Sequence, residues 1–165
     1  ADAYFSVYPG VWRHGDWVTF FDDGSCVVSG RSDATLNRGG VRLGTSDFYA
    51  VVESFEEIVD SLVVHLEDSS ASGGLGELSL FVVLADGVEL DDDLQRQIKR
   101  RLSSELSPRH APDRIVVVPA VPRTLSGKKL EVPVKRILSG ADPANVASRD
   151  SLADPAALDW FAANA

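Results

Sequence analysis

The amino-acid sequence predicts a small mixed domain of α+β or α/β class, in which helices and strands alternate around a short sheet. Residues 78–85 (LSLFVVLA) form the most apolar run and fit a strand that is buried on both faces. Two other segments, which begin at Phe48 and Leu94, repeat apolar residues at helical spacing. Turn-forming residues such as Asp86-Gly87 separate these segments. We therefore expect one small sheet with helices around it.

The first 44 residues predict a hairpin followed by a connector. Residues 17–21 and 26–29 are expected to be short strands, because Asp22-Asp23-Gly24-Ser25 between them is a strong turn signal. Residues 30–44 (GRSDATLNRGGVRLG) hold four glycines and three arginines and show neither alternation nor a helical period. This connector could be a solvated surface loop. We favour a mobile segment whose arginines and backbone amides meet a polyanionic ligand, because glycine admits close backbone approach.

After the connector the sequence predicts a helix and a set of strands. Thr45-Ser46-Asp47 supplies N-cap chemistry at the start of the helix. The apolar face of this helix is expected to carry Phe48, Val51, Val52 and Phe55. Strands are expected at residues 61–66, 78–85 and 114–118.

Three further helices are expected in the second half of the chain. One begins at Asp91-Asp92-Asp93, since a helix N-terminus favours negative charge. Its apolar stripe is Leu94, Ile98, Leu102 and Leu106. A short helix over residues 130–138 would hold Pro133 in its first turn. The last is an amphipathic helix with Trp160 and Phe161, which should dock on this domain or on another part of the protein because their exposure is costly.

The charge distribution limits the classes of ligand. A net charge of −9 argues against nucleic acid as a partner. Residues 43–95 contain thirteen acids and no lysine or arginine, whereas residues 96–136 contain eleven basic residues and three acids. The basic half could hold a phosphate-bearing ligand, although a basic surface without nucleic-acid affinity is the more common finding.

Composition also bears on location and completeness. No apolar run approaches the roughly 20 residues that cross a bilayer, so no membrane partner is expected. Cys26 is the single cysteine and cannot form an internal disulfide, which favours a reducing, cytoplasmic location. The sequence contains no methionine, so we expect it to be a fragment, a processed product or an excised piece. By itself this chain is then expected to be inactive.

Ser126-Gly127-Lys128 resembles part of a phosphate loop but does not complete the phosphate-loop motif. The motif GxxxxGK[ST] is incomplete, because Lys129 follows Lys128 and Pro122 stands where the first glycine is needed. What remains is a lysine presented after a glycine on a tight turn. Such a lysine is either simply solvated or able to neutralise charge that develops on a carboxylate and a phosphate in a transition state.

The other candidate functional residues support weaker predictions than Lys128 does. The histidines His14, His65 and His110 have no metal-ligand spacing, and with one cysteine a zinc site is not expected. The serine-hydrolase motif GxSxG is absent from the sequence. Asp16 is a better candidate, because a carboxylate can accept hydrogen bonds from both hydroxyls of a ribose.

Three motifs in one order carry a family resemblance: Gly15-Asp16-Trp17, then GRSD and GGVRLG within residues 30–44, then PRTLSGK at residues 122–128. Together they resemble the C-terminal part of the adenylate-forming superfamily, which includes acyl-CoA synthetases, luciferases and the adenylation domains of nonribosomal peptide synthetases. That family has a GD motif, a GR-x-D hinge, a G-x-R loop and P-x-T-x-SGK in this order. The segments PGVWRHGDW, SPRHAP and LADPAALDWF further resemble short-chain acyl-CoA synthetases, with acetoacetate as the expected acid.

The resemblance implies an α+β fold, a small mixed-sheet C-terminal lid domain preceded by the last hairpin of a large N-terminal domain. Residues 1–32 would be the end of that large domain. Residues 33–140 would form the lid, with the hinge at Asp33, and residues 141–165 a C-terminal extension with a short amphipathic helix. Rotation at the hinge would let the lid alternate between two poses.

The resemblance also implies roles for nucleotide-binding residues. Asp16 would hold the ribose hydroxyls of ATP, Arg31 would support that contact and Arg42 would approach the phosphates. Lys128 matches the family lysine that bridges the substrate carboxylate and the α-phosphate. Leu125 stands where the family usually has an arginine, which removes a charge beside Lys128.

CoA-binding residues follow from the same resemblance. Gly39 and Gly40 would admit the phosphopantetheine arm of CoA, because a Cβ would obstruct it. Ser103 stands where relatives carry an arginine that contacts the CoA 3′-phosphate. Arg101, or Arg100 beside it, would substitute.

The implied reaction joins acetoacetate to CoA through an acyl-adenylate, with ATP and its Mg²⁺ and CoA as substrates. The implied partner is the large N-terminal domain. Because related synthetases are inactivated by acylation of the matching lysine, a protein lysine acetyltransferase and a deacetylase would act on Lys128. No nucleic acid or membrane is expected. The alternative is a non-catalytic module that binds a partner protein through its aromatic ends and basic face.

Overall fold

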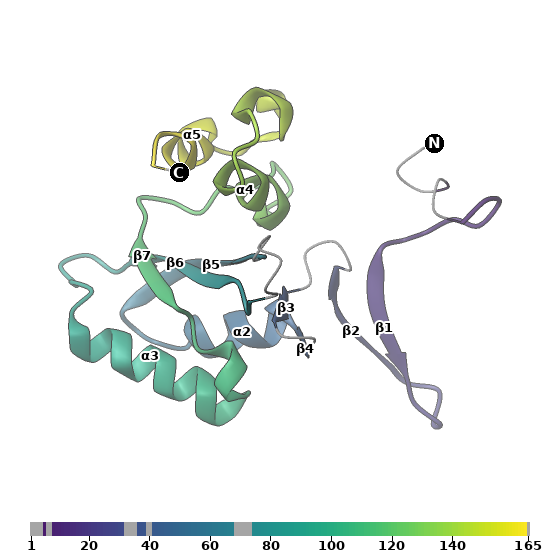
Figure 1. Cartoon of the computed structure of the whole chain (residues 1–165), viewed down its shortest axis with the longest axis horizontal. Coiled ribbons are helices and arrows are strands. Elements are labelled where there is room, and N and C mark those ends of the chain that lie inside the picture. The colour runs from purple at the N-terminus through teal and green to yellow at the C-terminus, as the bar shows by residue number, and fades with distance from the viewer. Residues whose placement is uncertain (1–4, 6–7, 32–35, 39–40, 68–73, 165) are drawn as a thin grey trace.

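A three-stranded mixed sheet lies at the centre of the computed structural model (Figure 1). Its strands are β5 (Ile58–Leu66), β6 (Glu77–Leu84) and β7 (Arg114–Val117), in the order β5-β6-β7. Strand β6 pairs antiparallel with β5 and parallel with β7. The predicted mixed sheet is confirmed. The structure describes residues 5, 8–31, 36–38, 41–67 and 74–164.

Strand β6 is the central strand, as its apolar run predicted. Leu78, Leu80 and Val82 are fully buried in one apolar cluster, and Phe81 lies in a second. Because side chains alternate between the two faces of a strand, a strand that is apolar at most successive positions needs cover on both faces, and even Ser79 of β6 is fully buried. The sheet therefore has a core on each side.

Helices α2 (Thr45–Val52) and α3 (Asp92–Glu105) cover the first face (Figure 1). The backbone N–H of Leu94 donates to the Asp91 carboxylate at 2.8 Å, so Asp91 is the N-cap of α3. The buried residues of α3 are Leu94, Ile98 and Leu102, which confirms the predicted stripe, and Leu106 is the partly buried C-cap.

Helices α4 (Glu131–Leu138) and α5 (Pro155–Ala163) cover the opposite face. Phe161 of α5 is fully buried and meets Phe81 edge-on, with ring centroids 4.9 Å apart. The C-terminal helix thus docks on this domain. Three short 3₁₀ turns complete the chain: η1 (Pro108–His110), η2 (Pro143–Asn145) and η3 (Arg149–Ser151).

The predicted connector contains structure that the sequence pattern did not reveal. Strands β3 (Leu36–Arg38) and β4 (Val41–Leu43) form an antiparallel hairpin, in which Leu36 pairs with Leu43 and both side chains are buried in the first core. Two three-residue strands are too short to show a period, so the sequence pattern did not predict these strands.

The predicted cap of α2 is also wrong. Gly44 is the N-cap, without a side-chain hydrogen bond, and Thr45 is already helical and buried. Thr45, Ser46 and Asp47 are therefore the first three residues of the helix rather than its cap.

A separate hairpin precedes this domain (Figure 1). Strands β1 (Asp16–Phe20) and β2 (Cys26–Arg31) pair antiparallel, as predicted, with a bulge after Trp17. Among its described side chains, Val18, Phe20, Val27 and Val28 face solvent, and Phe20 is 76% exposed. Within the described residues, none of the helices combines the length and the apolar character that crossing a membrane requires.

Candidate functional site

Lys128 lies on a tight turn closed by its own backbone. The N–H of Gly127 donates to the Thr124 carbonyl at 2.8 Å, and the N–H of Thr124 donates to the Lys128 carbonyl at 2.9 Å. Gly127 has a φ of 83°, which favours glycine. Arg123 and Lys129 pair across the base of the turn. The predicted presentation of Lys128 after a glycine on a tight turn is confirmed.

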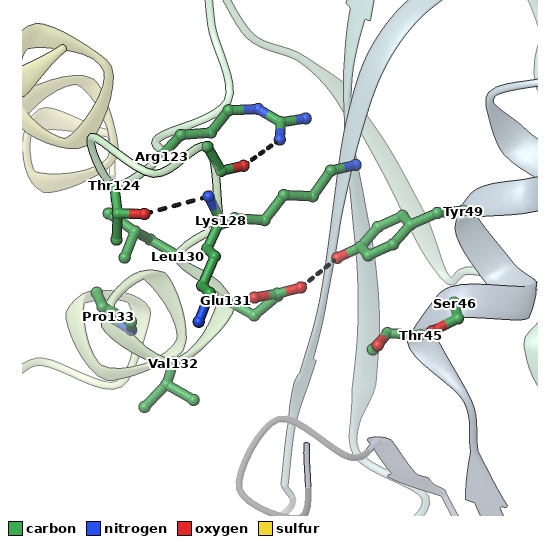
Figure 2. A pocket seen from close by; sticks show the side chains of 12 residues that line it. Thr45, Ser46, Tyr49, Arg123, Thr124, Lys128, Leu130, Glu131, Val132 and Pro133 are labelled. Carbon is green, nitrogen blue, oxygen red and sulfur yellow. Dashed lines mark hydrogen bonds between the residues drawn. The ribbon is translucent and has the colours of Figure 1, made fainter. Parts of the chain in front are cut away.

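The side chain of Lys128 is exposed beside a cavity of about 530 Å³ (Figure 2). The first residues of α2, Thr45 and Ser46, and of α4, including Val132, line the same cavity. Neither helix has a side-chain N-cap in the structure, so their first backbone N–H groups favour negative charge nearby. A lysine between two such helix ends favours an anion.

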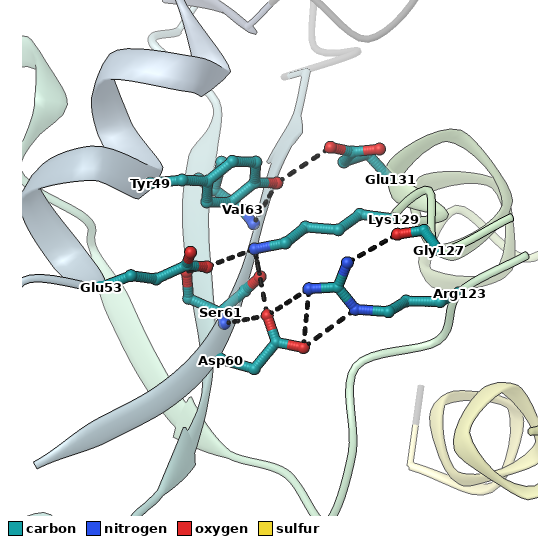
Figure 3. Close-up of polar contacts among 9 residues, drawn as sticks. All are labelled: Tyr49, Glu53, Asp60, Ser61, Val63, Arg123, Gly127, Lys129 and Glu131. Carbon is teal, nitrogen blue, oxygen red and sulfur yellow. Dashed lines mark hydrogen bonds and ion pairs between the residues drawn. The ribbon is translucent and has the colours of Figure 1, made fainter.

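Lys129 lies in the opposite environment, although it follows Lys128 directly (Figure 3). Its side chain is only 12% exposed. The Nζ atom donates to Glu53 and to the Ser61 carbonyl, the latter at 2.6 Å, and lies 3.7 Å from the centre of the Tyr49 ring. Of the two adjacent lysines, only Lys128 offers its ammonium group to a ligand.

Asp16 and Arg31, the predicted ribose contacts, are brought together by the N-terminal hairpin. They are Cα partners at the end of the β1–β2 ladder, although fifteen positions separate them in the chain. The Asp16 carboxylate, 19% exposed, contacts Nδ1 of His14. Arg31 lies on β2, but its side chain is outside the description.

The other predicted connector residues are placed only in part. Arg42 lies on β4 opposite Asn37, and its side chain is outside the description. Asp33, Gly39 and Gly40 fall outside the described residues. The hinge, CoA and phosphate roles of this segment therefore stay predictions.

Arg101 lies on α3 and its guanidinium group is engaged within the domain. It donates to Glu105 at 2.7 Å and lies 5.1 Å from the centre of the Phe55 ring. Ser103 donates to the Lys99 carbonyl at 2.8 Å. A CoA contact by Arg101 stays a prediction.

Sequence reasoning missed the charged residues beneath the turn, which are Glu53, Asp60, Arg123 and Lys129. Two of them come from the acidic half of the sequence and two from the basic half. The uneven charge distribution was the signal that could have found them, because opposite charges distant in sequence can neutralise one another in the fold. Part of the predicted basic surface is therefore used internally.

Comparisons with known proteins agree with this geometry. Residues 49–128 match the family model of the AMP-binding enzyme C-terminal domain. The acetoacetyl-coenzyme A synthetase of Rhizobium meliloti (strain 1021) is 44% identical over 162 residues, which cover 97% of this chain and 24% of that protein.

Two solved structures show the same fold. An acetoacetyl-CoA synthetase from Streptomyces lividans is 45% identical and matches with a TM-score of 0.88, over 99% of this chain and 24% of that one. An amide bond synthetase from Marinactinospora thermotolerans is 25% identical, with a TM-score of 0.64 over 81% of this chain and 26% of that one. The chain thus spans about a quarter of the length of these relatives. It belongs to the AMP-binding enzymes of the adenylate-forming superfamily, and what it carries is their C-terminal domain.

Proposed function

We propose that this chain is the lid of an ATP-dependent acyl-CoA ligase that converts acetoacetate, ATP and CoA into acetoacetyl-CoA, AMP and pyrophosphate. The observation that carries the proposal is the exposed Lys128 on a hydrogen-bonded turn, within a chain 44% identical to an acetoacetyl-CoA synthetase. Acetoacetate is chosen because this resemblance extends over nearly the whole chain.

In the first half-reaction a carboxylate oxygen of acetoacetate attacks the α-phosphorus of ATP, and pyrophosphate leaves. Two anions must approach one another, and ATP enters as its Mg²⁺ complex. The ammonium group of Lys128 would lie between the carboxylate and the α-phosphate, where it orders both groups and stabilises the charge of the transition state. Asp16 would hold the ribose and Arg42 would contact the phosphates.

In the second half-reaction the CoA thiolate attacks the acyl carbonyl of the adenylate, and AMP leaves. Rotation at Asp33 would withdraw Lys128 and bring up the segment of Gly39 and Gly40, whose bare backbone admits the pantetheine arm. Arg101 would contribute to binding of the CoA nucleotide.

Acetylation of Lys128 would regulate the first half-reaction, because it removes the charge that adenylation needs. The exposure of the side chain supports access by a protein acetyltransferase and a deacetylase in the cytoplasm. An acetyltransferase that labels the Lys128→Arg variant as strongly as the parent would contradict this part of the proposal.

The function is tested in the full-length enzyme with Lys128→Ala. We expect loss of acetoacetate-dependent ATP–pyrophosphate exchange, while CoA still captures the acyl group of supplied acetoacetyl-adenylate. Lys135→Ala is the control, because Lys135 is an α4 lysine that pairs with the exposed Glu67 at 3.0 Å, and it should leave both half-reactions unchanged. Unchanged exchange in Lys128→Ala would exclude the proposed role.

A protein-interaction module is the second candidate. The exposed apolar side chains of the N-terminal hairpin, including Phe20, Val27 and Val28, favour contact with another protein surface. In a lid this surface would be the large N-terminal domain of the same enzyme. Full exchange activity in Lys128→Ala, together with loss of a bound partner in Phe20→Ser, would support the module instead.

A further inference from the structure

Four charged side chains meet beneath the turn that carries Lys128 (Figure 3). Glu53 is the C-cap of α2 and Asp60 lies on β5, whereas Arg123 and Lys129 are the paired residues at the base of the turn. The two carboxylates thus connect the two ends of the turn to α2 and β5.

Asp60 receives both cations. Arg123 donates to it from Nη2 at 2.8 Å and 2.9 Å and from Nε at 3.1 Å, and Lys129 Nζ lies 3.1 Å from Oδ1. Burial by itself raises the pKa of Asp60, but the hydrogen bonds from Arg123 and the charge of Lys129 outweigh burial and hold this pKa below its ordinary value. Asp60 is therefore ionised at neutral pH and binds both ends of the turn.

Lys129 has its full set of partners. An ammonium group carries three N–H donors, and three oxygens face them, from Glu53, Asp60 and the Ser61 carbonyl. The Tyr49 ring covers the ammonium group, which adds a cation–π contact. A lysine held in this way has no donor left for a substrate.

Arg123 connects this cluster to the residue before Lys128. Its Nη1 donates to the Gly127 carbonyl at 2.7 Å while its Nη2 is bound to Asp60. Both chain neighbours of Lys128 are thereby tied to β5: Gly127 through Arg123, and Lys129 directly. The Lys128 side chain itself has no ion-pair partner within the described part of the chain, so its position depends on these two neighbours.

We propose that Glu53, Asp60, Arg123 and Lys129 form a positioning cluster that fixes the turn for Lys128 and at the same time withholds Lys129 from substrate and from acylating reagents. The proposal rests on the adenylation function proposed for Lys128. The physical reason is that misplacement of a reacting group by about 1 Å costs on the order of 100-fold in rate.

The first experiment separates the half-reactions in the full-length enzyme with Asp60→Asn, which keeps the shape of the side chain and removes its charge. We expect ATP–pyrophosphate exchange to fall by about 10- to 100-fold, with thiolation of supplied acetoacetyl-adenylate unchanged. Glu67→Gln is the matched control, because it also removes a carboxylate paired with a lysine, yet its Lys135 partner is at the domain surface. It should change neither rate.

The second experiment needs no enzyme activity. The full-length protein is labelled briefly with limiting acetic anhydride, and acetylation of each lysine is measured by mass spectrometry. We expect Lys128 to be labelled and Lys129 to be protected in the parent protein. In Asp60→Asn and in Glu53→Gln, labelling of Lys129 should rise relative to Lys135, which reports any general loosening of the domain.

The outcomes distinguish the two proposals. Unchanged exchange in Lys128→Ala would contradict the adenylation function. The labelling result would then test only whether the cluster protects Lys129. If Lys128→Ala abolishes exchange while Asp60→Asn keeps both parental exchange and protected Lys129, the positioning cluster is wrong. An equal loss of both half-reactions in Asp60→Asn would also overturn it, because that loss indicates a structural role alone. Should Asp60→Asn not fold, Glu53→Gln decides by the same criteria, since the Glu53 side chain is 34% exposed.

Discussion

Arg38 donates to Asp113 at 2.6 Å and so joins the β3–β4 hairpin to the start of β7 across 75 positions of the chain. The same guanidinium group donates to the Ala111 carbonyl at 2.7 Å, and the second oxygen of Asp113 accepts from the Leu78 N–H at 2.7 Å. The hairpin that follows the expected hinge is therefore bound to the lid by a nearly buried cation.

Replacement of Arg38 tests this connection. We expect Arg38→Met to lower the free energy of unfolding of the chain by about 2 kcal/mol, because it leaves the Ala111 carbonyl and the Asp113 carboxylate without their charged donor. Urea denaturation measures the change. Arg149→Met is the control, since its pair with Asp159 is exposed, and its urea midpoint should match the parent. Equal midpoints for both variants would contradict the connection.

Replacement of Asp91 tests whether its side chain stabilises the start of α3 as an N-cap. Its carboxylate accepts from the Leu94 N–H, so Asp91→Ala should lower the free energy of unfolding by about 1 kcal/mol. Asp92→Ala removes a neighbouring charge at the same helix end but no cap, and should have a smaller effect. The two thermal midpoints measure the difference, and an equal shift would show that charge alone, without the cap, stabilises this helix end.

Replacement of Phe161 tests whether the C-terminal helix α5 is packed against the sheet. Because its ring is fully buried against Phe81, Phe161→Ala should destabilise the chain by about 3–5 kcal/mol. Phe20→Ala, at an exposed ring of the N-terminal hairpin, should change the free energy of unfolding by less than about 0.5 kcal/mol. Urea denaturation followed by far-UV circular dichroism compares the two. A small effect of Phe161→Ala would mean that α5 does not belong to the core.

The positioning cluster predicts a pH dependence of stability. The pKa of Asp60 is lower in the folded chain than in the unfolded one, so the unfolded state binds more protons in the acid range and stability rises with pH there. This contribution is fully present above the ordinary pKa of a carboxyl, about 3.9, and is lost as the pH falls through the lowered value. Urea midpoints between about pH 6 and pH 2 should fall less steeply for Asp60→Asn than for the parent. Parallel curves would contradict the assignment.

The sequence by itself determined most of the secondary structure and the presentation of Lys128 on a turn. The nearly continuous apolar run at residues 78–85 fits a strand covered on both faces, and β6 is that strand. Leu94, Ile98 and Leu102 recur at the period of a helix, so the sequence alone predicts that they share one face of α3. The glycine before Lys128 likewise predicted a turn that presents the lysine.

Only the tertiary structure decided which charges and which short strands are buried. Lys128 and Lys129 are adjacent, and the sequence does not show that one side chain is exposed and the other enclosed; that difference comes from Glu53 and Asp60, which lie more than sixty positions away. The β3–β4 hairpin is stabilised by the burial of Leu36 and Leu43 in the first core and by contact of β3 with β5 rather than by a local period. Contacts across a sheet depend on topology, whereas periodicity reports only one element at a time. The pattern could therefore place Lys128 on its turn, but only the fold shows what holds that turn in place.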